Sequence, residues 1–177
     1  MRKTNIRRDN YLKFLNTWQN RDVIKVLSGV RRSGKSTLLA MFQQDLKAQG
    51  IQAENIIAIN FELMEFEELT DYRKLHDYVL SKVDKNKKNY VFLDEIQHVT
   101  NFEKVVDSLY VRDYIDLYIT GSNAFFLSGE LATLLTGRYI EQHVLPLSFQ
   151  EFKQWHLENN PIIQQLSNRD LYVMYTR

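Results

Sequence analysis

Cysteine is absent from the 177-residue chain, which excludes disulfide bonds and thiolate metal sites. Proline occurs only twice, and no linker, internal repeat or low-complexity segment divides the sequence. No apolar run approaches the ~18 residues that a membrane-spanning helix needs, and no apolar signal region follows the polar N-terminus. We therefore expect a cytoplasmic protein without a membrane partner.

An excess of one charge sign is also lacking, because 23 Lys and Arg residues balance 22 Asp and Glu residues to a net charge of +1. This balance gives no sign of a polyanion-binding surface and neither indicates nor excludes nucleic acid. The 44% hydrophobic and 25% charged residues are typical of a globular protein. The length suits one domain, since domains commonly run ~100 to 200 residues.

Short apolar runs alternate with helical patterns along the chain. Buried strands are predicted at residues 23–27, 56–59, 90–93, 114–119 and 139–145. Helices are predicted after an Asp9 cap, over 38–46 before Gly50, over 75–83, after an Asn101 cap, and from the Ser148–Glu151 capping box. This alternation predicts an α/β fold, a three-layer α/β/α sandwich around a mostly parallel five-stranded sheet.

The expected organisation has three parts. Residues 1–20 form a helical lead-in, residues 21–147 form the core domain, and residues 148–177 form a helical C-terminal segment. In such a sheet, ligands bind beyond the carboxyl ends of the strands, and every motif discussed next falls at such an end.

Residues 29–36 fit the pattern G-x-x-x-x-G-K-S/T without a mismatch, between a predicted strand and a predicted helix. Glycines let backbone N–H groups approach phosphates closely, and the helix N-terminus adds positive potential. We expect Lys35 to reach the β- and γ-phosphates of ATP and Ser36 to ligate Mg²⁺. The predicted nucleotide-binding residues are Gly29, Arg31, Arg32, Ser33, Gly34, Lys35, Ser36 and Thr37. The fold is thus predicted to be a P-loop NTPase.

Asp94 and Glu95 follow the third apolar run directly. In P-loop enzymes the first such carboxylate holds the metal and the second polarises the attacking water. A carboxylate pair after a strand can instead cap the next helix, but the P-loop upstream favours the metal and base roles.

Two further segments hold candidates for catalysis. Thr120, Ser122 and Asn123 end the next strand, where a polar side chain could sense the γ-phosphate or orient the attacking water. Ser122 is the first choice, and ordinary turn chemistry is the alternative. Arg138 precedes the last strand, where it could act as an arginine finger in a neighbouring subunit. A solvated or salt-bridged arginine explains it equally well.

Together these motifs resemble a family of bacterial and archaeal AAA-type ATPases, over residues 29–37, 91–97, 119–123, 135–138 and 146–152. The resemblance implies an AAA/ASCE-type core in which Asp94 and Glu95 serve magnesium and water, Ser122 is a sensor and Arg138 a finger. Members usually carry a nuclease-like or DNA-binding C-terminal region after this domain. The chain stops at Arg177, and we expect residues 148–177 to be the start of such a region in truncated form.

The expected function is Mg²⁺-dependent hydrolysis of ATP to ADP and phosphate, used as a conformational switch. Expected partners are ATP and ADP, with a homo-oligomer and a nucleic acid or protein client left open. One alternative is a nucleotide-gated binding module for DNA or protein that holds ATP without turnover. Another is a small-molecule phosphotransferase, in which Asp94 or Glu95 contacts an acceptor hydroxyl.

Overall fold

Five parallel strands form one sheet in the computed structural model, which describes residues 6–122, 135, 137–159 and 166–176. The strands are β1 (Ile24–Ser28), β2 (Ile56–Asn60), β3 (Asn89–Asp94), β4 (Ile115–Gly121) and β5 (Tyr139–His143). Their order across the sheet is β2-β3-β4-β1-β5. All five are parallel, so the predicted sheet is confirmed.

The strand register brings three carboxyl ends together. β1 lies between β4 and β5, with Ser28 opposite Gly121 and His143. β3 pairs with the other edge of β4, where Leu93 faces Ile119. The segments that leave β1, β3 and β4 therefore begin side by side, which brings the P-loop, the Asp94–Glu95 pair and Ser122 to one edge of the sheet.

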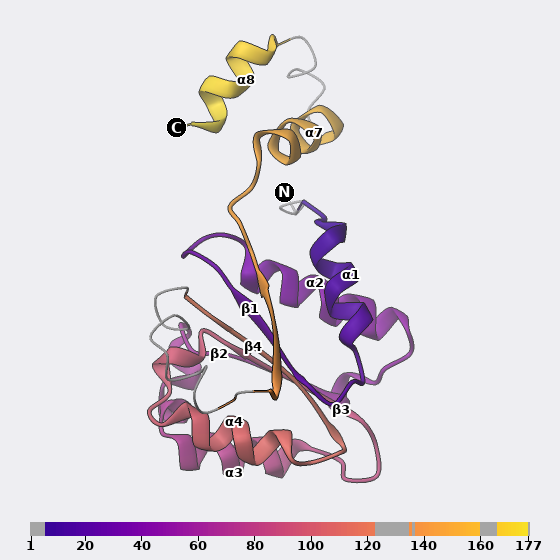
Figure 1. The fold of residues 1–177 in the computed structure, drawn as a ribbon, viewed down its shortest axis with the longest axis vertical. Coiled ribbons are helices and arrows are strands. Elements are labelled where there is room, and N and C mark those ends of the chain that lie inside the picture. Colours follow the sequence, from indigo (N-terminus) through magenta and orange to yellow (C-terminus); the bar gives the residue numbers. More distant parts are fainter. Residues whose placement is uncertain (1–5, 123–134, 136, 160–165, 177) are drawn as a thin grey trace.

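Helices cover both faces of the sheet, as a three-layer sandwich requires (Figure 1). Helices α1 (Asp9–Trp18) and α2 (Lys35–Ala48) cover one face, and α3 (Tyr72–Lys82) and α4 (Phe102–Tyr110) cover the other. Short 3-10 turns, η1 (Ala53–Asn55), η2 (Met64–Thr70) and η3 (Ile96–His98), complete the connections.

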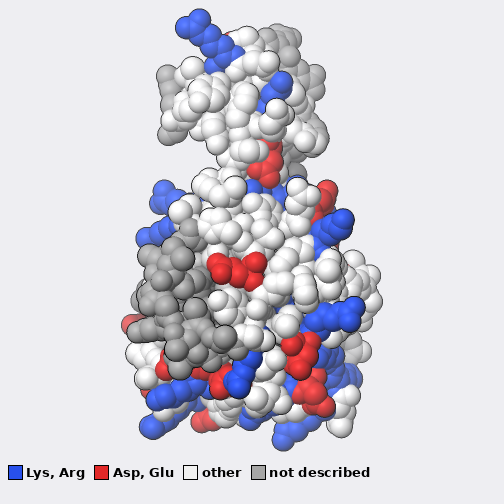
Figure 2. Space-filling model, viewed as in Figure 1, with Lys and Arg blue, Asp and Glu red and all other residues white. Residues whose placement is uncertain are grey.

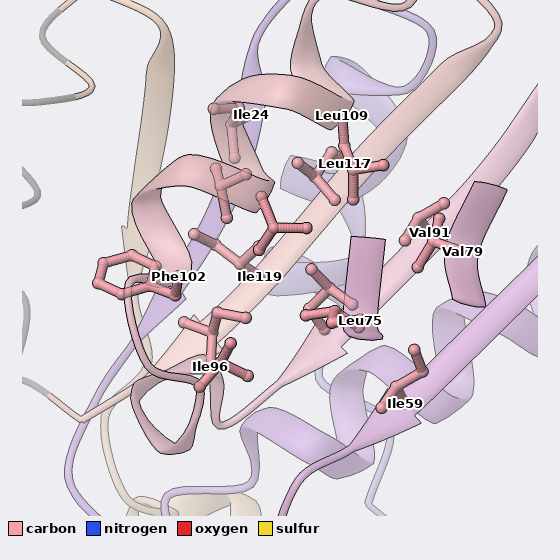
Figure 3. Packing of buried hydrophobic residues seen from close by; sticks show 14 of the residues in the cluster. Ile24, Ile59, Leu75, Val79, Val91, Ile96, Phe102, Leu109, Leu117 and Ile119 are labelled. Atoms are coloured by element: carbon pink, nitrogen blue, oxygen red, sulfur yellow. The ribbon is translucent and has the colours of Figure 1, made fainter. Parts of the chain in front are cut away.

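The larger core lies between the sheet and α3 with α4. Aliphatic side chains from β1, β2, β3 and β4 meet those of the two helices in Figure 3. The buried members shown there include Ile24, Ile59, Leu75, Val79, Val91, Ile96, Phe102, Leu109, Leu117 and Ile119. Burial of this apolar surface is the main force that holds the layer on the sheet.

The opposite core, under α1 and α2, contains three contacting aromatic rings. Phe92 stacks on Tyr118 with a centroid distance of 4.7 Å, and Phe42 of α2 contacts Tyr118 at 5.3 Å. Leu12 and Leu15 of α1 are buried in the same cluster. The rings therefore fix α2, and with it the segment that precedes α2, against the centre of the sheet.

Two further helices, α7 (Phe149–Asn159) and α8 (Asn168–Tyr175), stand beyond the sheet in Figure 1. They pack through aromatic rings. The ring centroids of Phe149 and Tyr172 lie 5.3 Å apart, and those of Phe152 and Tyr175 lie 5.5 Å apart. The space-filling view shows a narrow waist between this part and the main body (Figure 2). Positive and negative side chains are interspersed over the lower main body in that view.

Several predicted ends and caps were wrong in detail. Asp9 does not cap α1: it is the first helical residue, Arg8 occupies the cap position, and the Asp9 carboxylate pairs with Arg7 instead. Asn101 precedes α4 but makes no capping bond, because its backbone is left-handed, with φ of 50°. The last strand ends at His143, two residues earlier than expected. The Ser148–Glu151 capping box is confirmed by bonds in both directions.

Candidate functional site

The loop between β1 and α2 depends on two glycines. A Cβ atom on Gly29 would lie 2.4 Å from the Val144 carbonyl oxygen and 2.8 Å from Ser33 Oγ, so only glycine fits. Gly34 has φ of 97° at the N-cap of α2, a conformation that side chains disfavour. The loop thus wraps tightly and delivers the first N–H groups of a 14-residue helix to its concave side.

Lys35 is a buried cation at the first position of α2. Its Nζ lies 3.1 Å from the Gly29 carbonyl oxygen and 3.3 Å from that of Val30. The Glu95 carboxylate lies 3.2 Å from the same nitrogen. Lys35 therefore bridges the loop and the end of β3, and its predicted contact with the phosphates stays a prediction.

Asp94 closes β3 beside the first turn of α2. Its carboxylate accepts hydrogen bonds from the Thr120 and Ser36 hydroxyls. Burial raises the pKa of Asp94, and these two hydrogen bonds oppose that rise. The contact brings together Ser36 and Asp94, the two predicted metal ligands, and so offers a hard cation two oxygen atoms on adjacent elements.

Glu95 follows in a left-handed conformation with φ of 57°. Its amide donates to Thr120 Oγ1 at 2.9 Å, so β4 fixes the turn in which Glu95 lies. The carboxylate contacts Lys35 through Oε1 and accepts a 2.6 Å hydrogen bond from Gln97 Nε2 through Oε2. Left-handed backbone at a non-glycine residue costs energy and clusters at functional sites, which fits a carboxylate aimed at a reactive centre.

Ser122 lies directly after β4, next to the strand that leads into the P-loop. Thr120, which sequence reasoning ranked below it, makes the contacts with Asp94 and Glu95. The sensor role of Ser122 stays a prediction. Asn123 lies outside the described residues.

The remaining P-loop residues differ in their exposure. Arg31 points outward, with a side chain that is 83% exposed and paired with Glu62 at 3.0 Å. Arg32 is exposed, with a left-handed backbone, and Thr37 is half-buried in the first turn of α2. Ser33 is buried, and its hydroxyl has no hydrogen-bond partner among the described residues.

Arg138 lies at the opposite edge of the sheet, because it precedes β5, which is parallel to β1. Its carbonyl oxygen accepts from the Ile24 amide at the start of β1, and its guanidinium pairs with Asp107 of α4. Within one chain it is therefore remote from Lys35. The finger role of Arg138 stays a prediction, and it requires a neighbouring subunit.

Sequence reasoning missed two residues that contact the site. Gln97 donates to Glu95, and its Oε1 is buried without a partner in the described part of the chain. Its position two residues after Glu95, before a helix, was the available signal. Arg8 donates to the Ser33 carbonyl oxygen from 25 positions away, and no local pattern could have indicated this contact.

Fold and site together define a P-loop protein of the AAA type, with a tight glycine loop, a buried lysine and an acidic pair at the carboxyl edge of a parallel sheet. A family model described as an AAA domain matches residues 21–153, and the chain belongs to that family.

A curated protein of Haemophilus influenzae, described as uncharacterized, is 48% identical over 153 residues, which are 86% of this chain and 38% of that protein. The chain spans less than two fifths of the length of the curated relatives it matches.

Solved structures agree on the fold. The Walker-type ATPase of Pyrococcus abyssi has a TM-score of 0.63 at 16% identity, over 96% of this chain and 62% of that one. The Aeropyrum pernix ORC1 protein, solved in complex with DNA, has a TM-score of 0.60 at 11% identity, over 88% and 49%. Within the described residues, no helix is both long and apolar enough to cross a membrane.

Proposed function

We propose that this chain binds ATP with Mg²⁺ and hydrolyses it to ADP and phosphate, and that the reaction serves as a conformational switch. The observation that carries the proposal is the contact of Lys35 with Glu95 across the loop, beside the Ser36–Asp94 pair. These four side chains come from two motifs about 60 positions apart in the sequence. Their convergence is what a reaction at the γ-phosphate needs.

The loop fits a polyphosphate. The Ser33 hydroxyl is buried and has no hydrogen-bond partner in the described part of the chain, so it remains as a donor for a phosphate oxygen. Lys35 would hold the β- and γ-phosphates in place of its carbonyl contacts, and Thr37 would donate to the α-phosphate. Arg31 and Arg32 add positive charge beside the loop.

The acidic pair fits a magnesium ion on one side and a water molecule on the other. Ser36 and Asp94 would hold Mg²⁺, which neutralises phosphate charge when bound. Glu95 would accept a proton from the attacking water, with its carboxylate oriented by Gln97. Thr120 fixes both acids through their contacts with β4.

The proposal extends to partners. Arg138 lies too far from its own P-loop to serve it, which supports a homo-oligomer in which it reaches a neighbour's site. The likeness to a DNA-bound ORC1 structure makes nucleic acid a client to test alongside protein. A cytoplasmic location is proposed on the cysteine-free composition.

A phosphotransferase is the second candidate, because a cavity of about 270 Å³ adjoins Ser36 and Asp94, the proposed ligands of Mg²⁺. Ser36, Asp94, Asn60, Leu63, Glu65 and Phe66 are among its lining residues. An acceptor hydroxyl bound there would be close to the phosphate site. ADP formation that depends on an added acceptor would favour this function over hydrolysis.

The test is magnesium-dependent phosphate release by the wild type and by Glu95→Gln over a range of protein concentrations. We expect the substitution to keep ATP binding and to slow release by ~100-fold or more, since it removes a general base. Release that rises faster than linearly with concentration supports a site completed between subunits. Normal release by Glu95→Gln contradicts the role of Glu95, and ATP binding without release by the wild type favours the non-hydrolysing module.

A further inference from the structure

Arg8, just before α1, is a buried cation whose side chain is only 7% exposed. Its Nε lies 2.7 Å from Glu151 Oε1. Its Nη1 donates to the Leu145 carbonyl oxygen at 2.9 Å and to the Ser33 carbonyl oxygen at 3.2 Å. The guanidinium also lies 4.4 Å from the centre of the Tyr11 ring. A buried charge is costly unless it is fully paired, so this convergence of partners needs an explanation.

The partners of Arg8 belong to three separate segments. Ser33 is in the P-loop, one residue before the helix cap, and Leu145 is in the connection that follows β5. Glu151 is in the first turn of α7. The planar guanidinium of arginine carries five N–H donors in a fixed fork, whereas the donors of a lysine all lie on one nitrogen atom. One side chain thus links the P-loop backbone to α7.

Glu151 also determines how α7 begins. Its Oε2 accepts from the Ser148 amide at 2.8 Å and from the Ser148 hydroxyl at 2.9 Å. Burial acts to raise the pKa of Glu151, but the hydrogen bonds from Ser148 and Arg8 lower it overall, so its ionised form is favoured. Movement of α7 therefore moves the carboxylate that pairs with Arg8.

We propose that Arg8 is a positioning residue that couples the P-loop to α7. This inference rests on the proposed nucleotide function of the loop. A nucleotide that shifts the Ser33 peptide alters the Arg8 contact and hence the position of α7. Coupling between two sites is reciprocal, so a change at Glu151 should alter the affinity for nucleotide. The carboxylate of Glu151 contacts Arg8 and Ser148, so this effect would have to pass through Arg8.

The experiment is a calorimetric titration of the chain with MgATP, for Arg8→Ala, Glu151→Gln and the double variant. We expect Arg8→Ala to weaken binding about ten-fold, the size of one charge-assisted hydrogen bond. Glu151→Gln should weaken it about three-fold or more, and the double variant should bind no more weakly than Arg8→Ala alone. Arg8→Lys, which keeps the charge without the fork, should recover part of the affinity.

Two matched controls separate coupling from general damage. Arg7→Ala removes the adjacent arginine, which is exposed and pairs with Asp45 of α2 at 2.9 Å. Asp170→Asn removes the equivalent acid from the capping box that opens α8. Both should retain wild-type affinity for MgATP, and thermal unfolding of every variant shows whether it is folded at the titration temperature.

The outcomes are distinguishable. Failure of the wild type to bind MgATP contradicts the proposed function itself. Binding by the wild type with equal affinity in Glu151→Gln overturns the coupling and leaves the function intact. Additive losses in the double variant overturn it as well, because they make Arg8 and Glu151 independent.

Discussion

The Glu95 carboxylate is held from two directions, with Lys35 Nζ 3.2 Å from one oxygen and Gln97 Nε2 2.6 Å from the other. The orientation of a general base affects the chemical step more than the binding of substrate. A substitution of Gln97 therefore tests whether the orientation of Glu95 matters, and it leaves the P-loop unchanged.

Replacement of Gln97 by alanine should slow phosphate release about ten-fold and change MgATP affinity less than about two-fold. Steady-state phosphate release and equilibrium titration measure the two quantities. Gln49→Ala is the control, since this glutamine contacts Asn16 on the surface. Equal loss of affinity and rate in Gln97→Ala would place its role in binding instead.

The ionised carboxylate of Asp94, which the proposed function needs, should reduce the stability of the fold. Burial raises its pKa, so the folded state holds the proton more tightly than the unfolded state does. Its contribution to stability is present below the unfolded pKa, ~3.9, and is lost as the pH rises through the raised value. At pH 7 the ionised Asp94 therefore destabilises the fold.

Asp94→Asn should raise the Tm at pH 7 by about 3 °C, the shift expected for ~1 kcal/mol in a chain of this length. The gain should shrink near pH 3, and magnesium should no longer strengthen ATP binding. Thermal unfolding by circular dichroism at both pH values measures the first effect. A lower Tm at pH 7 would mean that the hydrogen bonds to Asp94 outweigh its burial.

At the scale of elements, a buried ion pair fixes the start of β1 to β4. Lys25 and Asp116 are each at most 1% exposed in their side chains and form an ion pair. Asp116 also accepts from the Asn20 amide and from the Tyr118 hydroxyl, both at 2.8 Å. Burial lowers the pKa of Lys25 although Asp116 opposes it. The pair lies at the amino edge of the sheet, away from the P-loop.

Asp116→Ala should reduce the free energy of unfolding by ~3–5 kcal/mol, because it leaves a buried lysine unpaired. Urea unfolding measures this loss. Asp113→Ala, an exposed acid three positions earlier, should change stability by less than ~0.5 kcal/mol. Comparable small losses in both variants would show that water or backbone groups compensate Lys25.

Elements with strong local patterns could be predicted from the sequence. The run Val91–Leu93 and the spacing of Leu38, Phe42 and Leu46 gave β3 and α2, since buried strands and amphipathic helices have distinct periods. The place of the P-loop between β1 and α2, and of Asp94 at the end of β3, was predictable because each motif lies at the end of an apolar run. Contacts such as Arg8 with Ser33 could not be predicted, because only the assembled sheet brings these residues together.

Caps were predicted less well for the same reason. A residue of suitable type, such as Asp9 or Asn101, bonds a helix end only if its backbone conformation allows it. Asp9 is already helical, and Asn101 has a left-handed backbone. The capping box of Ser148 and Glu151 was predicted correctly because two mutually dependent hydrogen bonds define it.

At the scale of the whole molecule, Arg138 lies at the amino edge of the sheet and its own P-loop lies at the carboxyl edge. A finger role therefore predicts that two inactive variants complement each other. The Lys35→Ala subunit still carries Arg138, and the Arg138→Ala subunit still carries an intact P-loop, so a mixed pair contains one complete site. An equal mixture should recover roughly a quarter of the wild-type rate if each site forms between two subunits.

Phosphate release from the mixed variants measures this complementation. Asp107→Ala is the control, because it removes the partner of Arg138 and leaves the arginine in place, so it should retain activity. No recovery in the mixture, with full activity of Arg138→Ala alone, would assign Arg138 to an ordinary salt bridge.

The central claim is that residues 29–37 form the nucleotide site. Titration of the wild type and Lys35→Ala with ATP in the presence of magnesium tests it most directly. The account predicts saturable binding by the wild type and a loss of ~100-fold or more in Lys35→Ala, since a buried cation beside the phosphates is removed. Equal binding by the two proteins would contradict it.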